Sequence, residues 1–324
     1  MQAIRYEKYG QPDVLELRAV EKPTPQDDEV LVQVRAVSLN QYDWHLLTAD
    51  IFLVRLAAGL LKPKHGAPGA DVAGVVEAVG KNVTQFRAGD AVYGDIAAAG
   101  AGGCAEYVCA PEKLFAPKPD NLSFEQAAAV PMAGITALQG LRDAGKIQAG
   151  QDVLIQGAAG GVGTFALQIA KMFGAQVTAV CSTRNLEQAR ALGADEVIDY
   201  TKTDFTRAGK QYDLIFAANG YHSLADYKRA LKPHGSYVMA GGTAKQIFDV
   251  LLWGAWHSRG GQKMSSLTAH PSQPDLLFLK QQIEARKIIP VIDRCYPLPQ
   301  TADAMRYLGA GHARGKVIIT VGAN

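Results

Sequence analysis

The sequence has few cysteines, little net charge and no long apolar run. Four cysteines in 324 residues are too sparse for a disulfide framework, so we expect reduced thiols. The 33 Lys and Arg against 31 Asp and Glu leave a formal charge of +2, which predicts no nucleic-acid partner. No window approaches the roughly 18 apolar residues of a membrane span, and the first residues carry charges where a signal peptide needs an apolar core. These absences predict a cytoplasmic protein.

Two regions of different pattern follow one another along the chain. The length and a hydrophobic fraction of 48% suggest two domains, each with a packed core. The first 120 residues contain short β-branched runs, notably 30–37 and 74–80, separated by turns rich in Pro and Gly. This pattern predicts a β-rich domain built as a partly open barrel.

From residue 123 onward, strands and helices alternate. Ser123 is predicted to cap a helix that starts with an alanine-rich run. Strands are expected at 153–156, 177–181, 213–217 and 237–240, and helices at 162–173, 185–192 and 223–231. This alternation predicts a parallel sheet with helices on both faces. A helix at 275–286 and strands at 290–292 and 316–321 are expected to return to the first domain, which gives domains of 1–121 with 266–324, and 122–265.

A glycine-rich turn is the most informative stretch of the chain. A buried strand ends at Gln156, and a helix is expected to begin within the segment that follows. Small residues there allow a tight turn and a close approach of the backbone to a pyrophosphate, which the helix N-terminus then holds. The predicted contacts are Gly157, Ala159, Gly160, Gly161, Val162 and Gly163. A packing turn without a ligand is the alternative interpretation.

The residues after the second strand favour NADPH over NADH. An NAD-binding unit places an acidic residue there, on the ribose 2′-hydroxyl. Here Ser182, Thr183 and Arg184 follow Cys181, and the next carboxylate in the sequence is Glu187. Hydroxyls and a guanidinium suit a 2′-phosphate, although Arg184 could also be a solvated loop charge.

Several motifs together resemble the medium-chain dehydrogenase/reductase superfamily, in its zinc-free quinone oxidoreductase branch, which is zeta-crystallin-like. The resemblance runs nearly from end to end of the chain. The motifs are Gly10-Gln-Pro-Asp-Val-Leu, Ser38-Leu-Asn-Gln-Tyr-Asp-Trp, Pro68-Gly-Ala-Asp-Val-Ala-Gly, Gly102-Gly-Cys-Ala-Glu-Tyr, the glycine turn and Gly315-Lys-Val-Ile-Ile. The resemblance implies an α/β fold with two domains. One is a Rossmann domain with a doubly wound parallel sheet, the other a GroES-like β-barrel catalytic domain, and the active site lies in the cleft between them.

The resemblance also implies that zinc is absent. Zinc alcohol dehydrogenases of this superfamily use Cys and His ligands at positions that correspond here to Asn40, Ala70 and Met132. An amide, a methyl group and a thioether do not supply those ligands. Without a Lewis acid, an acceptor that is already electrophilic is favoured, namely a quinone or an α,β-unsaturated carbonyl.

The family pattern of an Asn followed three residues later by Asp corresponds to Asn40 and Asp43. Asn40 is expected to donate a hydrogen bond to the acceptor oxygen. Tyr42 is either a proton donor or a packing residue, and the two interpretations stay open. Capping of a turn at a strand end is the alternative for Asn40 and Asp43.

Further cofactor contacts are implied by the resemblance. Thr136 corresponds to a residue near the nicotinamide ribose, and Tyr200 to a tyrosine near the adenosine 2′-phosphate. Asn219 stands where relatives often carry Asp. The backbone of Ala240, Gly241 and Gly242 is expected beside the nicotinamide. Lys316 is either a cofactor contact or a surface lysine.

Two apolar segments and one histidine lie outside these motifs. Residues 51–65 combine apolar and basic side chains, and we favour a flap over the substrate pocket over a membrane-surface helix. Residues 251–257 could line the same pocket or a subunit interface. For His45, the histidine nearest the predicted site, packing is favoured over catalysis because no partner is visible.

The predicted function is a zinc-independent, NADPH-dependent reduction of a quinone or an α,β-unsaturated carbonyl. One alternative is an alcohol or aldehyde dehydrogenase activity that uses NAD(P). Another is a protein that binds NADPH as a crystallin-like or RNA-binding protein, although the near-neutral charge gives RNA no support. Family membership suggests a homodimer.

Overall fold

The computed structural model describes residues 1–242, 246, 248–250, 252, 254, 258 and 261–322, without the side chains of Phe52, Leu53 and Ala57. The chain divides into two compact units. Unit 1 contains residues 1–133, 271–286 and 290–324, and unit 2 contains residues 134–270 and 287–289. The domain boundaries predicted at 121/122 and 265/266 stay a prediction.

Unit 2 is built on a six-stranded sheet whose neighbouring strands are all parallel. The strand order is β10-β9-β8-β11-β12-β13. The strands are β8 (Asp152–Gln156), β9 (Gln176–Cys181), β10 (Glu196–Asp199), β11 (Tyr212–Ala217), β12 (Leu231–Met239) and β13 (Lys263–Ser266). The chain proceeds outward from β8 in one direction and from β11 in the other. The strand order therefore reverses between β8 and β11, which is where sheets of this type bind ligands.

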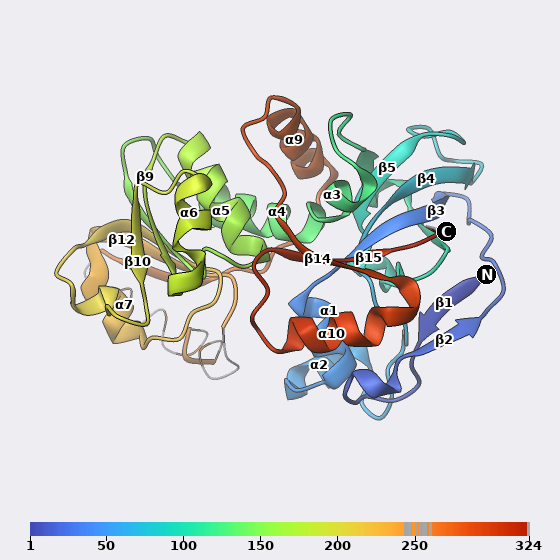
Figure 1. The fold of residues 1–324 in the computed structure, drawn as a ribbon, viewed down its shortest axis with the longest axis horizontal. Helices are drawn as coiled ribbons and strands as arrows, with labels where there is room; N and C mark the ends of the chain where they lie inside the picture. Colours follow the sequence, from blue (N-terminus) through green and yellow to red (C-terminus); the bar gives the residue numbers. More distant parts are fainter. Residues whose placement is uncertain are drawn as a thin grey trace. The chain divides into compact units, whose positions relative to one another are not determined.

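Helices cover both faces of this sheet. In Figure 1, α5 (Gly161–Met172) and α6 (Leu186–Ala191) lie on one side and α7 (Leu224–Ala230) on the other. The Ser223 hydroxyl caps α7 by accepting a hydrogen bond from the Asp226 amide. The helix α4 (Pro131–Leu138) continues as a π-helix over Gln139–Ala144. The predicted alternation of strands and helices is confirmed.

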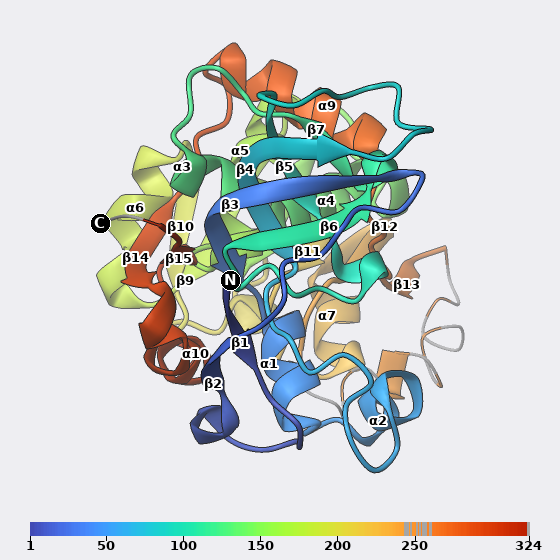
Figure 2. The ribbon, with the colours of Figure 1, turned by 90° about the vertical axis from the view of Figure 1, so that its right-hand side faces the viewer.

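Unit 1 contains a seven-stranded sheet of mostly antiparallel strands. Its order is β14-β15-β3-β4-β5-β7, with β6 also paired to β3, and Figure 2 shows β3 beside β4 and β6. The strands are β3 (Glu29–Leu39), β4 (Asp71–Val79), β5 (Ala91–Asp95), β6 (Tyr107–Pro111), β7 (Phe115–Pro117), β14 (Ile292–Pro297) and β15 (Lys316–Thr320). A hairpin of β1 (Gln2–Arg5) and β2 (Glu16–Ala19) adds a two-stranded sheet. Because β15 lies between β14 and β3, the end of the chain completes the sheet that its beginning starts.

Five helices of unit 1 flank this sheet or its loops. They are α1 (Gln41–Thr48), α2 (Phe52–Ala58), α3 (Phe124–Ala128), α9 (Gln273–Glu284) and α10 (Thr301–Gly309). Short 3₁₀ turns are η1 (Pro12–Val14), η2 (Ala97–Ala99), η3 (Glu112–Leu114) and η7 (Leu298–Gln300) in unit 1, with η5 (Thr183–Asn185) and η6 (Phe205–Arg207) in unit 2. The predicted cap is confirmed, because the Ser123 hydroxyl accepts a hydrogen bond from the Gln126 amide. Strand and helix side chains pack into a core that includes Val32, Phe115 and Met305.

Several elements depart from the sequence predictions. The strand predicted at 290–292 instead runs from Ile292 to Pro297, because Pro290 has no amide hydrogen and pairing with the Lys316 amide starts at the Val291 carbonyl. The helices α1 and α10 were not predicted, and neither was β10, which has only four residues. Among the described residues, no helix is long and apolar enough to cross a membrane.

Candidate active site

The glycine turn of unit 2 joins β8 to α5 through positions that accept no side chain. Gly157 has φ +76°, and a Cβ on Gly163 would lie 2.0 Å from the Gly157 carbonyl oxygen. Gly160 is the N-cap of α5, and Ala159, Gly161 and Val162 flank it. The first amides of a helix have no acceptor within that helix, so they form a positive site suited to a phosphate.

Three strand ends meet at this turn. The Ala218 amide donates to the Gln156 carbonyl at 3.0 Å, and the Gly220 amide donates to the Gly241 carbonyl at 3.0 Å. Asn219 is so near that a Cβ on Gly157 would lie 3.1 Å from its backbone nitrogen. The structure therefore brings Asn219 and residues 240–242, which are predicted cofactor contacts, to the carboxyl edge of the sheet beside Gly157.

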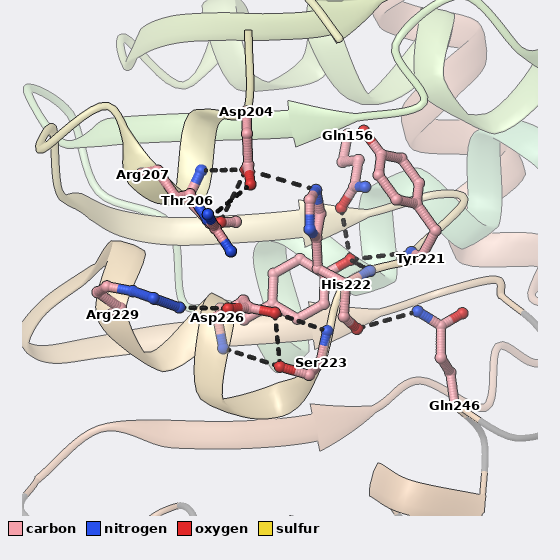
Figure 3. A network of polar contacts seen from close by, with 11 residues as sticks. Gln156, Asp204, Thr206, Arg207, Tyr221, His222, Ser223, Asp226, Arg229 and Gln246 are labelled. Atoms are coloured by element: carbon pink, nitrogen blue, oxygen red, sulfur yellow. Dashed lines mark hydrogen bonds and ion pairs between the residues drawn. The ribbon is translucent and has the colours of Figure 1, made fainter. Parts of the chain in front are cut away.

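A buried tyrosine holds the loop that carries Asn219. The Tyr227 hydroxyl donates to Gln156 Oε1 at 2.7 Å and accepts from the amides of Tyr221 and His222 at 3.1 and 3.3 Å. Figure 3 shows this network, which Gln246 extends by donating to the His222 carbonyl at 3.2 Å. The position of the loop is thus set from the interior of the sheet.

The residues predicted to bind the adenosine end lie together at the ends of β9 and β10. Asp199 is opposite Cys181 in the parallel pairing, and its Oδ2 accepts a hydrogen bond from the Thr183 hydroxyl. Tyr200 follows Asp199, is 49% exposed, and packs edge-on against Tyr221 with ring centroids 6.0 Å apart. Hydrogen bonds from Thr183 and Thr201 lower the pKa of the Asp199 carboxyl.

Asp199 places a carboxylate beside the predicted 2′-phosphate contacts, and the sequence directly after β9 does not reveal it. Ser182, Thr183 and Arg184 were the predicted contacts for a 2′-phosphate, yet the Thr183 hydroxyl already donates to Asp199. The register of the short strand β10 is what brings the carboxylate there, and strand register is not visible in a local motif. Thr136, the last predicted contact in this unit, lies partly exposed in α4.

A buried group in unit 1, which we call the polar cluster, consists of Asn40, Asp71 and Lys316. Asn40 Nδ2 donates to Asp71 Oδ2 at 3.0 Å and to the Ser38 carbonyl at 3.3 Å, and Lys316 Nζ donates to Asn40 Oδ1. Lys316 Nζ also lies 3.5 Å from Asp71 Oδ2. Burial raises the pKa of Asp71 and lowers that of Lys316.

This geometry bears on two predictions. Asn40 uses its amide hydrogens on Asp71 and Ser38 within unit 1, and its role as a donor to the acceptor stays a prediction. Lys316 is only 3% exposed, so the surface-lysine alternative is wrong. Its role as a cofactor contact stays a prediction.

Asp43 joins the start of α1 to the segment before β4. Its Oδ2 accepts a hydrogen bond from the backbone amide of Asn40 and its Oδ1 from the backbone amide of Gly69, both at 2.8 Å. This is the turn-capping role that the sequence analysis gave as the alternative for Asp43. Burial raises the pKa of Asp43 to about 6, although the hydrogen bonds from the two backbone amides act to lower it. Asp95 is also buried, and burial followed by the charge of Asp71 raises its pKa to about 7.

A largely apolar pocket of about 630 Å³ lies within unit 1. Tyr42 and His45 of α1 line it together with Val54 of α2, and Tyr6, Leu46, Ile51, Ala58, Pro63, His65 and residues 97–100 complete the lining. Residues of the segment 51–65 therefore line a pocket, and the role of this segment as a flap stays a prediction. Burial raises the pKa of Tyr42 to about 12, so its hydroxyl keeps its proton at neutral pH. Of residues 251–257, only Leu252 and Gly254 lie inside the described residues.

Comparison with known proteins found family models, relatives and solved structures that match this chain. Residues 26–120 match a family described as alcohol dehydrogenase GroES-like domain, and residues 192–319 match one described as zinc-binding dehydrogenase. A 2-methylene-furan-3-one reductase of Solanum lycopersicum is 40% identical over 98% of this chain and 79% of its own length. An NADPH-dependent alkenal/one oxidoreductase of Arabidopsis thaliana is 35% identical with the same coverage. The solved quinone oxidoreductase of Coxiella burnetii has a TM-score of 0.89 and 31% identity, with 99% of both chains covered.

The chain belongs to the quinone oxidoreductase branch of the medium-chain dehydrogenase/reductase superfamily. The predicted fold class, a Rossmann domain with a GroES-like domain, is confirmed. The glycine turn fits the pyrophosphate of a dinucleotide, because Gly157 and Gly163 approach so closely that no side chain fits, and the first amides of α5 have no acceptor within the helix.

The three positions that hold catalytic zinc in alcohol dehydrogenases of this superfamily do not fit the metal here. Asn40 and the Met132 amide both donate to Asp71, and Ala70 directly precedes it. The amide, methyl and thioether groups are poor zinc ligands, and the Lys316 ammonium occupies the acceptor atoms that remain. We therefore derive no step through zinc.

Proposed function

We infer that this member of the family is an NADPH-dependent oxidoreductase that reduces quinones or α,β-unsaturated carbonyls. The observation that carries this inference is the glycine turn at the point of strand reversal, which provides a pyrophosphate site next to Asn219 and residues 240–242. The relatives support it, since one is named for NADPH and for alkenals and alkenones. A second relative is named a 2-methylene-furan-3-one reductase, and that compound is itself an α,β-unsaturated ketone.

NADPH, when bound, supplies a hydride. The residues of unit 2 have separate tasks in holding it. The amides at the start of α5 bind the pyrophosphate, and Gly157 keeps the turn close to it. Ser182 and Arg184 bind the 2′-phosphate by donating to its oxygens. Tyr200, half exposed beside Tyr221, packs on the adenosine end.

Unit 1 binds the acceptor in its apolar pocket. Tyr42 lines this pocket and its hydroxyl stays protonated, so this residue is assigned the hydrogen bond to the acceptor carbonyl as negative charge develops there. A hydrogen bond is a weaker activator than a Lewis acid, so the acceptor must be electron-poor before it binds. Quinones and enones meet that condition, and simple ketones do not.

The decisive experiment is NADPH oxidation measured by stopped flow against quinones, enones, aldehydes and alcohols. We expect turnover with quinones or enones and none with alcohols and NADP⁺. Tight NADPH binding without turnover on any of these acceptors would instead favour a binding protein. A parallel assay with NADH tests the cofactor preference.

Zinc independence, a homodimer and a cytoplasmic location are also part of this proposal. The donor chemistry around Asp71 supports the first. Metal analysis of the active enzyme checks it, and stoichiometric zinc would contradict it. Sedimentation equilibrium measures the subunit number, and imaging of the tagged chain in its host measures the location.

A further inference from the structure

A histidine and an aspartate form a pair at the end of α1, and the histidine lines the acceptor pocket. His45 Nδ1 lies 2.7 Å from Asp50 Oδ1, and the His45 side chain is 33% exposed. Sequence analysis found no partner for this histidine. The structure therefore shows a polar group, held by a carboxylate, in the lining of a largely apolar pocket.

The chain reverses between these two residues through an unusual backbone conformation. Ala49 is the C-cap of α1 and has φ +47° and ψ +37°, in the left-handed region that alanine rarely adopts. Its amide donates to the His45 carbonyl at 2.9 Å. This turn brings Asp50 back to the imidazole of His45. The left-handed conformation strains the backbone, and interactions elsewhere in the fold must offset the free energy of that strain.

The pair gives the imidazole a defined orientation. When Nδ1 donates its hydrogen to Asp50, Nε2 is the ring nitrogen left to hold or release a proton. The other titratable groups in the pocket lining are Tyr6, Tyr42 and His65. Burial raises the pKa of both tyrosines, which makes them reluctant to give up a proton completely.

The two acceptor classes differ in whether they need such a group. Addition of hydride to a quinone leaves charge on oxygen, which takes a proton rapidly from water. Addition of hydride to the β-carbon of an enone leaves an enolate, and the product forms only when the α-carbon is protonated. Proton transfer to carbon is slow without a positioned acid, so an enone reductase benefits from one.

We propose that His45, oriented by Asp50, is the catalytic acid that protonates the α-carbon, and that the pocket therefore takes α,β-unsaturated carbonyls in preference to quinones. The proposal rests on the proposed function. Hydride forms the new bond at the β-carbon, and the alkene electron pair moves to make the enolate. The α-carbon then takes the proton from His45 Nε2, and water returns a proton to the imidazole.

The test compares His45→Gln and Asp50→Asn with the parent enzyme on one enone and one quinone. We expect kcat for the enone to fall about 100-fold in His45→Gln while the quinone rate falls less than about threefold, because only the carbon protonation is lost. Asp50→Asn, a change at the positioning residue, should lower kcat for the enone with little change in KM, and Asp50→Glu should restore part of it. His312→Gln, at an exposed histidine of the same unit outside the pocket lining, is the matched control.

The stereochemistry of the product gives a second, independent readout. With an enone that carries a methyl group on its α-carbon, the parent should give one configuration at that carbon, because His45 delivers the proton to one face. His45→Gln should give a mixture, since water then supplies the proton.

The outcomes separate this proposal from the one it rests on. A parent enzyme that reduces neither acceptor contradicts the proposed function itself. A parent that reduces enones, with an equal loss on both acceptors or a single product configuration in His45→Gln, overturns the role of His45 and leaves the proposed function standing.

Discussion

The two units prepare their sites in opposite ways. In unit 2 the phosphate site is made from backbone, with Gly157 and Gly163 in contact and the amides of α5 left for a ligand. In unit 1 the polar cluster is made from side chains, and a buried ammonium, an amide and a carboxylate satisfy one another. The first arrangement depends on the absence of side chains, the second on the presence of each one.

This difference has an energetic consequence. A backbone site has no charge of its own to desolvate, so it is stable without its ligand. A buried ion pair such as Lys316 with Asp71 is stable only while both partners are there, because either charge alone is costly to bury. Single substitutions should therefore affect ligand binding at the glycine turn and folding at the polar cluster.

The largest effect is expected at Gly163. Gly163→Ala forces a methyl group against the Gly157 carbonyl at 2.0 Å, so the turn must move, and we expect NADPH affinity to fall by more than about 100-fold. Fluorescence titration of NADPH measures the affinity. Gly160→Ala is the graded comparison, since its Cβ would meet the same oxygen only at 3.7 Å, and it should lose less. Equal losses would contradict the steric explanation.

Removing the cation of the polar cluster should destabilise unit 1. Lys316→Met leaves Asp71 buried without its partner, and we expect the free energy of unfolding to fall by about 3 kcal/mol in a urea titration. Lys316→Met with Asp71→Asn should recover part of that loss. The matched control is Lys81→Met, which breaks the exposed pair of Lys81 with Asp27 at 2.9 Å and should cost less than about 1 kcal/mol. Similar losses at the two lysines would refute the importance of burial.

Cofactor choice is expected to depend on one side chain of unit 2. Arg184→Asp should weaken NADPH by roughly 30-fold and NADH by much less, because the new carboxylate would repel the 2′-phosphate that we propose the guanidinium binds. Binding of both cofactors to the apoenzyme measures the ratio. If the two affinities change equally, Arg184 does not contact the 2′-phosphate.

The smallest effect concerns pH and the buried carboxyl of Asp95. Its pKa of about 7 in the folded protein lies above the value near 4 of an unfolded aspartate. Between pH 4 and pH 7 the Asp95 carboxyl is therefore protonated in the folded state and ionised in the unfolded state. Stability from this group is complete below pH 4 and is lost as the pH rises through 7. Asp95→Asn should therefore raise the free energy of unfolding by about 1 kcal/mol at pH 8 and change it little at pH 4. Asp27→Asn, at an exposed carboxylate, is the control, and a parallel gain there would contradict burial as the cause.

What could be predicted from the sequence follows the same division. The strand β8, the glycine turn and α5 are contiguous, so their pattern carries both the fold and the site. Lys316 and Asn40 are 276 positions apart, and no local pattern connects them. The contact of Asp199 with Thr183 depends on the register of two parallel strands. His45 and Asp50 are near in sequence, but their pairing depends on a left-handed conformation at Ala49, and alanine gives no sign of it.

The place of β15 also determines when each unit can be finished as the chain is synthesised. The strand lies between β3 and β14 and carries Lys316, yet it follows every other described strand in the sequence. All six strands of unit 2 emerge before it, whereas Asn40 and Asp71 wait for their cation until β15 is synthesised. The nascent chain therefore has an interval in which the complete parallel sheet of unit 2 accompanies an open-edged β-sheet, and that interval is when a chaperone would have most to protect.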